Sequence, residues 1–393
     1  MNIDDIKTPC YIIDQNRFVD NIKAFRSAFN EIDLIIGYSF KTNHNKALLE
    51  KAIENDLYAE VVSNDEYELA KRSGYELGKI IFNGPQKSIK YLIESINANQ
   101  ITNLDSMQEV DMLIKHRKKL APNPTVGLRI NFDLEKYCPN ETTAGKLITR
   151  FGISVENGDF CKAVDLLHEY GIKINSIHLH YSTKTRSVNV FKNLAKIAIE
   201  TIYKYKLQNE IEFIDIGGGF FYGENIYAVG KPKLSDYADV IISELKALNK
   251  RVTLVIEPGA SLISTTVKYY TKIMSIKNVF GKRFCVVDGS VLHINPLMQV
   301  RKNIVNIIQQ NKTKIINEKQ CICGCTCMEM DRFIEFEDVN ELAIGDYIEC
   351  DCAGAYTMVY NSNFINTPPY IYAIYNNKVY IIRKKNKNNM NHY

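Results

Sequence analysis

Short apolar runs alternate with amphipathic stretches along much of the sequence, and this alternation constrains the fold more than any other feature. We predict eight strands, at residues 34–40, 59–63, 79–83, 100–104, 125–131, 176–181, 213–216 and 253–256. The stretches between them place apolar residues at helical spacing. Near-continuously apolar strands that alternate with helices are typical of a parallel sheet closed into a barrel. The sequence therefore predicts an α/β fold with a (β/α)8 TIM barrel.

Two of the intervening helices are predicted to begin with a capping box, in which a serine and a glutamate three residues later bond each other's backbone N–H groups. The two patterns are Ser63-x-x-Glu66 and Ser106-x-x-Glu109.

A different pattern begins after about residue 265, where strand-like runs follow one another closely at residues 265–273, 284–287, 332–335, 347–350 and 370–382. These runs predict a C-terminal antiparallel β domain. We assign the barrel to residues 28–265 and the β domain to residues 266–383. Residues 384–393 are rich in lysine and asparagine and are predicted to be a disordered tail.

The composition argues against macromolecular or membrane partners. The net charge of +4, with 24% charged residues, gives no field that predicts binding to nucleic acid or a membrane. No apolar run is long enough to cross a membrane, and the first residues lack the pattern of a signal peptide. We therefore expect a cytoplasmic protein with a small-molecule substrate, whose ten cysteines are reduced thiols.

Polar residues follow several predicted strands, at the barrel face that carries active sites. Lys41 follows the first strand, His178 and His180 end the sixth, residues 217–219 are three glycines after the seventh, and Glu257 follows the eighth. Each feature alone has a structural explanation, such as a solvated strand end or a tight turn. Their recurrence at corresponding places favours a common site.

These residue types suggest a particular cofactor. Glycine N–H groups after the seventh strand can approach a phosphate closely, and a lysine in a partly apolar pocket can form a Schiff base with an aldehyde. A phosphate and an aldehyde together suggest pyridoxal 5'-phosphate. Glu257 would then pair with the pyridine nitrogen, and His180 could stack on the ring.

At this point the sequence resembles the fold type III pyridoxal-phosphate decarboxylases, which act on diaminopimelate, ornithine, arginine or carboxynorspermidine and have an alanine-racemase-like barrel. Tyr38-Ser-Phe-Lys41-Thr-Asn43 is similar to the family's Tyr-x-x-Lys-x-Asn, whose lysine forms the Schiff base. Further similar segments are Leu128-Arg129-Ile130, Arg150-Phe-Gly152, His178-Leu-His180, Asp215-Ile-Gly217-Gly218-Gly219-Phe220 and Glu257-Pro-Gly259. The resemblance implies that Arg129, His180, Gly217, Gly218, Gly219, Glu257 and Gly259 surround the cofactor.

The resemblance continues in the β domain. Gly324-Cys-Thr-Cys327-Met-Glu-Met-Asp331 is similar to the segment whose cysteine reaches the partner subunit's active site and donates a proton. Gly354-Ala-Tyr356 is similar to the segment whose tyrosine contacts the phosphate. The resemblance also implies a head-to-tail homodimer with shared active sites, and an N-terminal strand near residues 8–14 that joins residues 1–27 to the β domain.

The departures from the family pattern concern the substrate. Ala260 stands where the family commonly has arginine, and Met328 stands where an acidic residue usually pairs with a distal amine. We expect Met328, Glu329 and Asp331 to face the substrate, with Glu329 replacing the missing acid only if the loop shifts. Thr183 stands near the position of the family's serine and would serve as the hydroxyl ligand.

The cysteines at 321, 323, 325 and 327 could suggest zinc or an iron–sulfur site. They lack the Cys-x2-Cys spacing of common zinc modules, and the family motif already accounts for Cys327. We therefore predict no metal.

The sequence predicts a pyridoxal-phosphate-dependent amino-acid decarboxylase with Lys41 and Cys327 as catalytic residues, whose substrate is not plain ornithine or diaminopimelate. An amino-acid racemase and a decarboxylase of a carboxynorspermidine-like polyamine precursor remain alternatives. A catalytically silent regulator is disfavoured, because the lysine and the glycine motif are intact.

Overall fold

The structure is a computed structural model, and it describes residues 5–142, 148–183, 185–222, 230–299, 305–360 and 364–385. The chain divides into two compact units. One consists of Met1–Asp20, Thr42–Leu48 and Leu262–Tyr393, and the other of Asn21–Lys41 and Leu49–Ser261. Most of the predicted tail, from residue 386 onward, lies outside the described residues.

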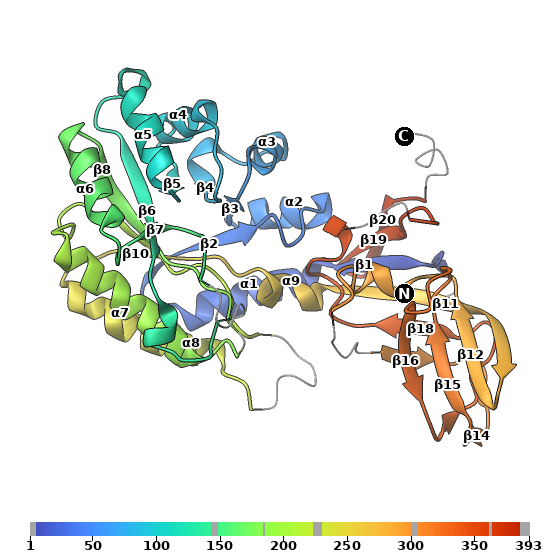
Figure 1. Cartoon of the computed structure of the whole chain (residues 1–393). Helices are drawn as coiled ribbons and strands as arrows, with labels where there is room; N and C mark the ends of the chain where they lie inside the picture. Colours follow the sequence, from blue (N-terminus) through green and yellow to red (C-terminus); the bar gives the residue numbers. More distant parts are fainter. Residues whose placement is uncertain are drawn as a thin grey trace. The chain divides into compact units, whose positions relative to one another are not determined.

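The second unit is the predicted barrel (Figure 1). Its eight parallel strands are β2 (Asp33–Ser39), β3 (Tyr58–Val61), β4 (Ile80–Phe82), β5 (Ile101–Leu104), β6 (Thr125–Asn131), β8 (Lys173–His178), β9 (Phe213–Asp215) and β10 (Thr253–Ile256). The pairings of β5 with β6 and of β10 with β2 close the ring. A short strand, β7 (Ile153–Ser154), pairs with β6 outside it. The predicted (β/α)8 fold is confirmed. The sixth strand, predicted at residues 176–181, runs from Lys173 to His178, so His180 follows the strand instead of ending it.

Helices run between the strands and cover the outside of the barrel (Figure 1). They are α2 (Lys46–Glu54), α3 (Asn64–Arg72), α4 (Ile89–Asn97), α5 (Met107–Lys115), α6 (Asp159–Glu169), α7 (Val188–Lys204) and α8 (Leu234–Leu245), with α1 (Gln15–Ala28) before the first strand and α9 (Ala260–Ile263) after the last. Aromatic packing joins α7 and α8 to the loop after β9: the Phe191 and Phe220 rings stack with centroids 4.5 Å apart, and Tyr237 meets both edge-on.

The two predicted capping boxes form only in part. Ser63 and Ser106 are the N-caps of α3 and α5, and each hydroxyl accepts the N–H of the expected glutamate. The glutamates bond one residue further back, Glu66 to the Val62 N–H and Glu109 to the Asp105 N–H. Both carboxylates therefore anchor the chain between strand and helix instead of completing the box.

The other unit is built on a sheet whose main path runs β16–β15–β12–β11–β1–β19–β20, and β18 also pairs with β11 and with β13. Its strands are β1 (Cys10–Asp14), β11 (Val267–Val279), β12 (Lys282–Val287), β13 (Val305–Ile308), β15 (Lys319–Cys323), β16 (Arg332–Phe336), β18 (Tyr347–Cys350), β19 (Tyr370–Tyr375) and β20 (Lys378–Arg383), while β14 (Ile315–Ile316) and β17 (Val339–Asn340) pair separately. Most pairs are antiparallel, as predicted, but β1–β19 and β12–β15 are parallel.

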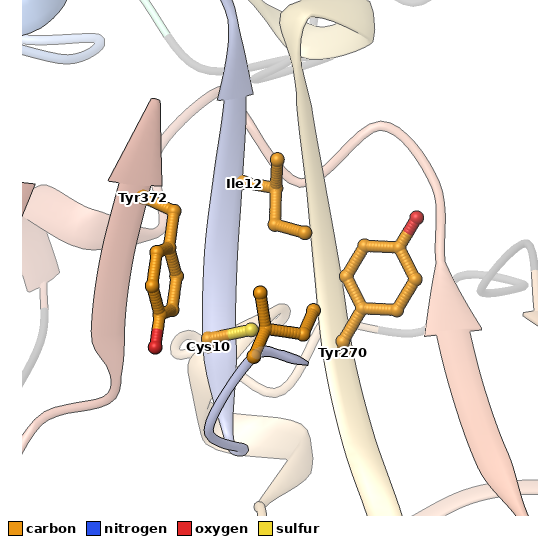
Figure 2. Packing of buried hydrophobic residues seen from close by; sticks show 5 residues of the cluster. Cys10, Ile12, Tyr270 and Tyr372 are labelled. Carbon is orange, nitrogen blue, oxygen red and sulfur yellow. The ribbon is translucent and has the colours of Figure 1, made fainter. Parts of the chain in front are cut away.

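Strand β1 lies between two strands that come far later in the chain. Tyr11 is opposite Tyr269 on β11 and Ile371 on β19. Figure 2 shows the packing on one face, where Cys10 and Ile12 lie between Tyr270 and Tyr372. The N-terminal strand is thus an inner strand of a sheet made mainly from the C-terminal part of the chain.

In the part of the chain that the structure describes, no helix is both long and apolar enough to span a membrane.

Candidate functional site

Lys41 comes two residues after β2 and makes an ion pair with a residue that the sequence analysis missed. Its Nζ lies 2.8 and 3.0 Å from the two carboxylate oxygens of Glu60, on the neighbouring strand β3. The Glu60 side chain is 1% exposed, whereas that of Lys41 is 38% exposed. The Ser39 hydroxyl also donates to Glu60. The sequence signal that could have identified Glu60 is a charged residue inside a short strand that is otherwise apolar.

Glu257 follows β10 and lies among other buried polar groups. Asn83 Nδ2 donates to Glu257 and, over 3.3 Å, to Glu60 Oε1. Carboxyl oxygens of Glu257 and Asp215 lie within 4.8 Å of each other, and both residues are buried. Burial, then the neighbouring Asp215 and Glu60 charges, hold the pKa of Glu257 well above its ordinary value. Burial likewise raises the pKa of Asp215 to about 7.

His178, the last residue of β8, is buried beside these carboxyls. Among the residues that the structure describes, neither ring nitrogen finds a hydrogen-bond partner, and Nε2 is 3.9 Å from Glu257 Oε2. Burial first, and the positive charge of Arg129 second, hold its pKa well below the usual value, so the ring is neutral. Ligand atoms of His178, Asp215 and Glu257 lie within 4.8 Å of one another, which is a spacing that could hold a metal ion.

Two of the predicted glycines, Gly217 and Gly218, are tightly packed against His180 and Glu257. Gly217 has φ +65°, and a Cβ there would lie 2.3 Å from His180 Nδ1. A Cβ on Gly218 would lie 2.2 Å from the Glu257 carbonyl oxygen. The Gly217 N–H donates to Asp215 Oδ1 and the Gly218 N–H to His180 Nδ1, at 2.9 and 3.1 Å. Two of the three N–H groups that we expected at a phosphate are thus bonded within the protein.

His180 remains partly exposed, while burial, Arg129 and Lys41 lower its pKa to about 3. Its ring is therefore neutral at ordinary pH, with Nδ1 as the acceptor of the Gly218 N–H. Arg129 contacts the same segment, because its guanidinium donates to the His180 carbonyl over 3.4 Å. Thr183, also predicted at the site, accepts the Arg186 N–H at 3.1 Å.

The remaining predicted residues belong to the β unit. Cys327 is exposed, and Glu329 is exposed and ion-paired with Arg332. Asp331 is buried and has a structural environment: its carboxylate accepts the Val291 N–H, the Thr326 N–H and the Thr326 hydroxyl at 2.8, 3.1 and 2.6 Å.

Two further predicted residues, Met328 and Tyr356, also lie in this unit. Met328 is half-buried, and its N–H donates to the Thr326 hydroxyl over 3.3 Å. Tyr356 has φ +55°, and its N–H donates to the carbonyl of Thr42, the residue after Lys41 in the chain.

The donor set in the barrel fits pyridoxal phosphate. Lys41 provides the amine, and the enclosed Glu257 carboxyl can meet a protonated ring nitrogen. A Cβ on Gly219, unlike one on Gly217 or Gly218, would stay 3.9 Å from the nearest described atoms. A cation beside Glu257 would offset the burial that raises its pKa. Fold and side chains together define a barrel that can bind an aldehyde cofactor through a lysine.

Comparison with known proteins gives the family. The family described as "Pyridoxal-dependent decarboxylase, pyridoxal binding domain" matches residues 15–264. The chain belongs to this family of pyridoxal-phosphate-dependent decarboxylases.

Similar proteins and solved structures agree with this family assignment. The "Probable diaminopimelate decarboxylase, chloroplastic" of Oryza sativa subsp. japonica is 28% identical over 73% of this chain, which spans 59% of that protein. The diaminopimelate decarboxylase of Methanocaldococcus jannaschii is 26% identical, in an alignment that covers 91% of this chain and 84% of that protein. The crystal structure of the M. jannaschii enzyme in complex with L-lysine has a TM-score of 0.83 at 26% identity, covering 97% of this chain and 90% of that one.

Proposed function

We propose that this chain removes the α-carboxylate of an amino acid as carbon dioxide, with Lys41 holding the cofactor as a Schiff base and Glu257 facing its pyridine nitrogen. The observation that carries the proposal is one hydrogen-bonded network: Lys41 pairs with Glu60, and Asn83 donates to both Glu60 and Glu257. The residue that would hold the aldehyde and the residue that would face the ring nitrogen are thereby fixed relative to each other.

Pyridoxal phosphate, when bound, supplies an electron sink for the pair left at Cα after carbon dioxide departs. Glu60 Oε2, 2.8 Å from Lys41 Nζ, is placed to accept the proton that the lysine loses before it acts as a nucleophile. Glu257 would stabilise a protonated ring nitrogen as its counter-ion. His180, which is neutral, would offer a flat face to the ring while its Nδ1 is held by the Gly218 N–H.

Cys327 is proposed as the proton donor to Cα in the active site of a partner subunit, which requires a homodimer. Its exposed thiol supports this role. The test mixes Lys41→Ala and Cys327→Ala subunits, each inactive alone. Activity that reappears on mixing supports shared sites, whereas silence in mixtures shown to exchange subunits contradicts them.

The substrate is proposed to lack a remote ammonium group that needs an acidic partner at position 328. The half-buried thioether of Met328 supports this, because it offers neither a charge nor a strong acceptor. Ala260 also provides no charge for a remote carboxylate. Decarboxylation of diaminopimelate is the second candidate, favoured by the names of the two relatives.

The test is carbon dioxide release by the cofactor-loaded protein from L- and D-amino acids, including meso-diaminopimelate, ornithine, lysine, arginine and carboxynorspermidine. Lys41→Ala is the control. Turnover of diaminopimelate would overturn the substrate proposal and keep the reaction. Loss of optical activity without carbon dioxide release would indicate a racemase and overturn the reaction.

A further inference from the structure

A second group of buried charges lies in the barrel and has no part in the function proposed above. Lys87 lies in the loop between β4 and α4, and its side chain is 0% exposed. Its Nζ is 3.0 Å from Glu109 Oε2 and donates to the Gly84 carbonyl at 2.7 Å. Burial lowers the pKa of Lys87, and the Glu109 carboxylate opposes that effect.

Glu109 connects two loops of the barrel. Its Oε1 accepts the Lys87 N–H at 3.2 Å and its Oε2 accepts the Asp105 N–H at 2.8 Å. The loop after β4 and the loop after β5 are therefore held by the same carboxylate. A buried ion pair is a weak source of net stability, because both charges lose their hydration. The fully bonded arrangement fits positioning better than stabilisation.

The connection continues from Asp105 to the candidate site. Asp105 Oδ1 pairs with Arg129 at 3.2 Å, and Arg129 donates to the His180 carbonyl at 3.4 Å. The guanidinium also lies 4.8 Å from the centre of the Phe151 ring. Three of these residues, Glu109, Asp105 and Arg129, are less than 10% exposed. Direct contacts thus run from the Lys87 ammonium to the backbone of His180.

We propose that Glu109, together with Lys87, is a positioning residue for the cofactor site: by fixing Asp105 it orients Arg129, and Arg129 sets the place of His180. The proposal rests on the proposed position of His180 beside the ring. It predicts that the pair governs how tightly and in what orientation pyridoxal phosphate binds, although neither residue touches it.

The test compares two charge-removing variants of similar shape. In Glu109→Gln, one of the two oxygens that accept backbone N–H groups becomes a donor, so Asp105 should lose its fixed position. The control is Glu94→Gln, which breaks the pair of Lys71 and Glu94, 2.6 Å apart and 29% exposed on both sides. We expect pyridoxal phosphate to bind Glu109→Gln about tenfold more weakly, as is typical when a supporting partner of a bound group is lost. Glu94→Gln should bind as the wild type does.

The second readout is the circular dichroism of the bound cofactor, which reports its orientation and needs no turnover. A changed band in Glu109→Gln is expected. A lower melting temperature of the cofactor-free variant with unchanged affinity and unchanged dichroism would show a merely structural role and overturn the proposal. A wild type that binds pyridoxal phosphate but releases no carbon dioxide would contradict the proposed function alone.

Asp105→Asn provides an independent variant should Glu109→Gln fail to fold. It should weaken cofactor binding to a similar extent, because it removes the charge that holds Arg129. Since both residues act through the same contacts, the double variant should lose no more affinity than either single one. Fully additive losses, or wild-type affinity in Asp105→Asn, would overturn the proposal.

Discussion

Glu60 is the residue on which the behaviour of Lys41 should depend most directly. Glu60→Gln keeps the size of the side chain and an acceptor for Ser39, but it removes the charge that pairs with Lys41 and the base that can take its proton. We expect kcat/KM to fall about a hundredfold, the scale of a misplaced reacting group. The control is Glu54→Gln, which breaks the surface pair with Lys51 on α2. Equal kinetics in the two variants would contradict a role for Glu60.

The carboxyl pair of Asp215 and Glu257 predicts how the cofactor-free protein responds to pH. In the folded protein the pKa of Asp215 is raised to about 7, against about 4 in the unfolded chain. The folded state therefore holds the Asp215 proton more tightly than the unfolded chain does. The stability that the protonated Asp215 contributes is present below pH 4 and is lost as the pH rises toward 7.

Urea unfolding of the cofactor-free protein at pH 5 and pH 8 checks this. The free energy of unfolding of the wild type should fall more between these two values than that of Asp215→Asn, in which the titrating group is gone. A fall of the same size in both proteins would assign the effect to other groups.

At the scale of single residues, the sequence indicated the groups that chemistry requires at strand ends, such as Lys41 and Glu257. It did not indicate Glu60, Asn83 or Glu109, because their importance depends on which strands and loops become neighbours. The pattern Ser106-x-x-Glu109 even suggested a local use for a carboxylate that the structure uses over a longer range.

At the scale of elements, the turn after β9 depends on glycine for two separable reasons. Gly217→Ala places a Cβ at φ +65° and against the His180 ring. Gly230→Ala meets a similar φ of +70°, but no atom of the described residues lies within 4 Å of its Cβ. We expect Gly230→Ala to cost about 1–2 kcal/mol of stability. Gly217→Ala should cost about 1–3 kcal/mol more, and it should also weaken cofactor binding.

Thermal unfolding and pyridoxal phosphate titration of the two alanine variants provide the measurement. If they lose equal stability and bind the cofactor equally well, the packing of Gly217 against His180 has no functional importance.

The elements of the barrel were predictable because each strand is apolar and is separated from the next by a helical period. The strands of the β unit were less predictable from the sequence. The run 370–382 forms two strands, β19 and β20, because Asn376 and Asn377 adopt φ +48° and +62° and turn the chain. Strand β15 was missed because its cysteines and flanking polar residues resemble neither a strand nor a turn pattern.

At the scale of the whole molecule, the C-terminal sheet depends on a strand from the other end of the chain. Ile12 on β1 is 5% exposed and packs with Tyr270 and Tyr372 (Figure 2). Ile12→Ala should lower the free energy of unfolding by about 2–5 kcal/mol. The matched control is Ile381→Ala on β20 of the same sheet, where the side chain is 54% exposed and the change should stay within about 0.5 kcal/mol.

Urea denaturation followed by intrinsic tyrosine fluorescence measures both changes. If Ile381→Ala proved as damaging as Ile12→Ala, the edge strand and not the inner strand would limit the stability of the sheet.

The inner position of β1 also has a consequence for synthesis on the ribosome. Asp14 ends β1, and its parallel partner begins at Tyr370. At roughly 5–20 residues per second, the first strand waits roughly 20–70 seconds for that partner to be translated. Throughout that interval the edge of β1 that β19 will cover stays unpaired and open to wrong partners. The yield of active protein in a cell should then depend more on how well β1 is protected from wrong partners during translation than on the final stability of the sheet.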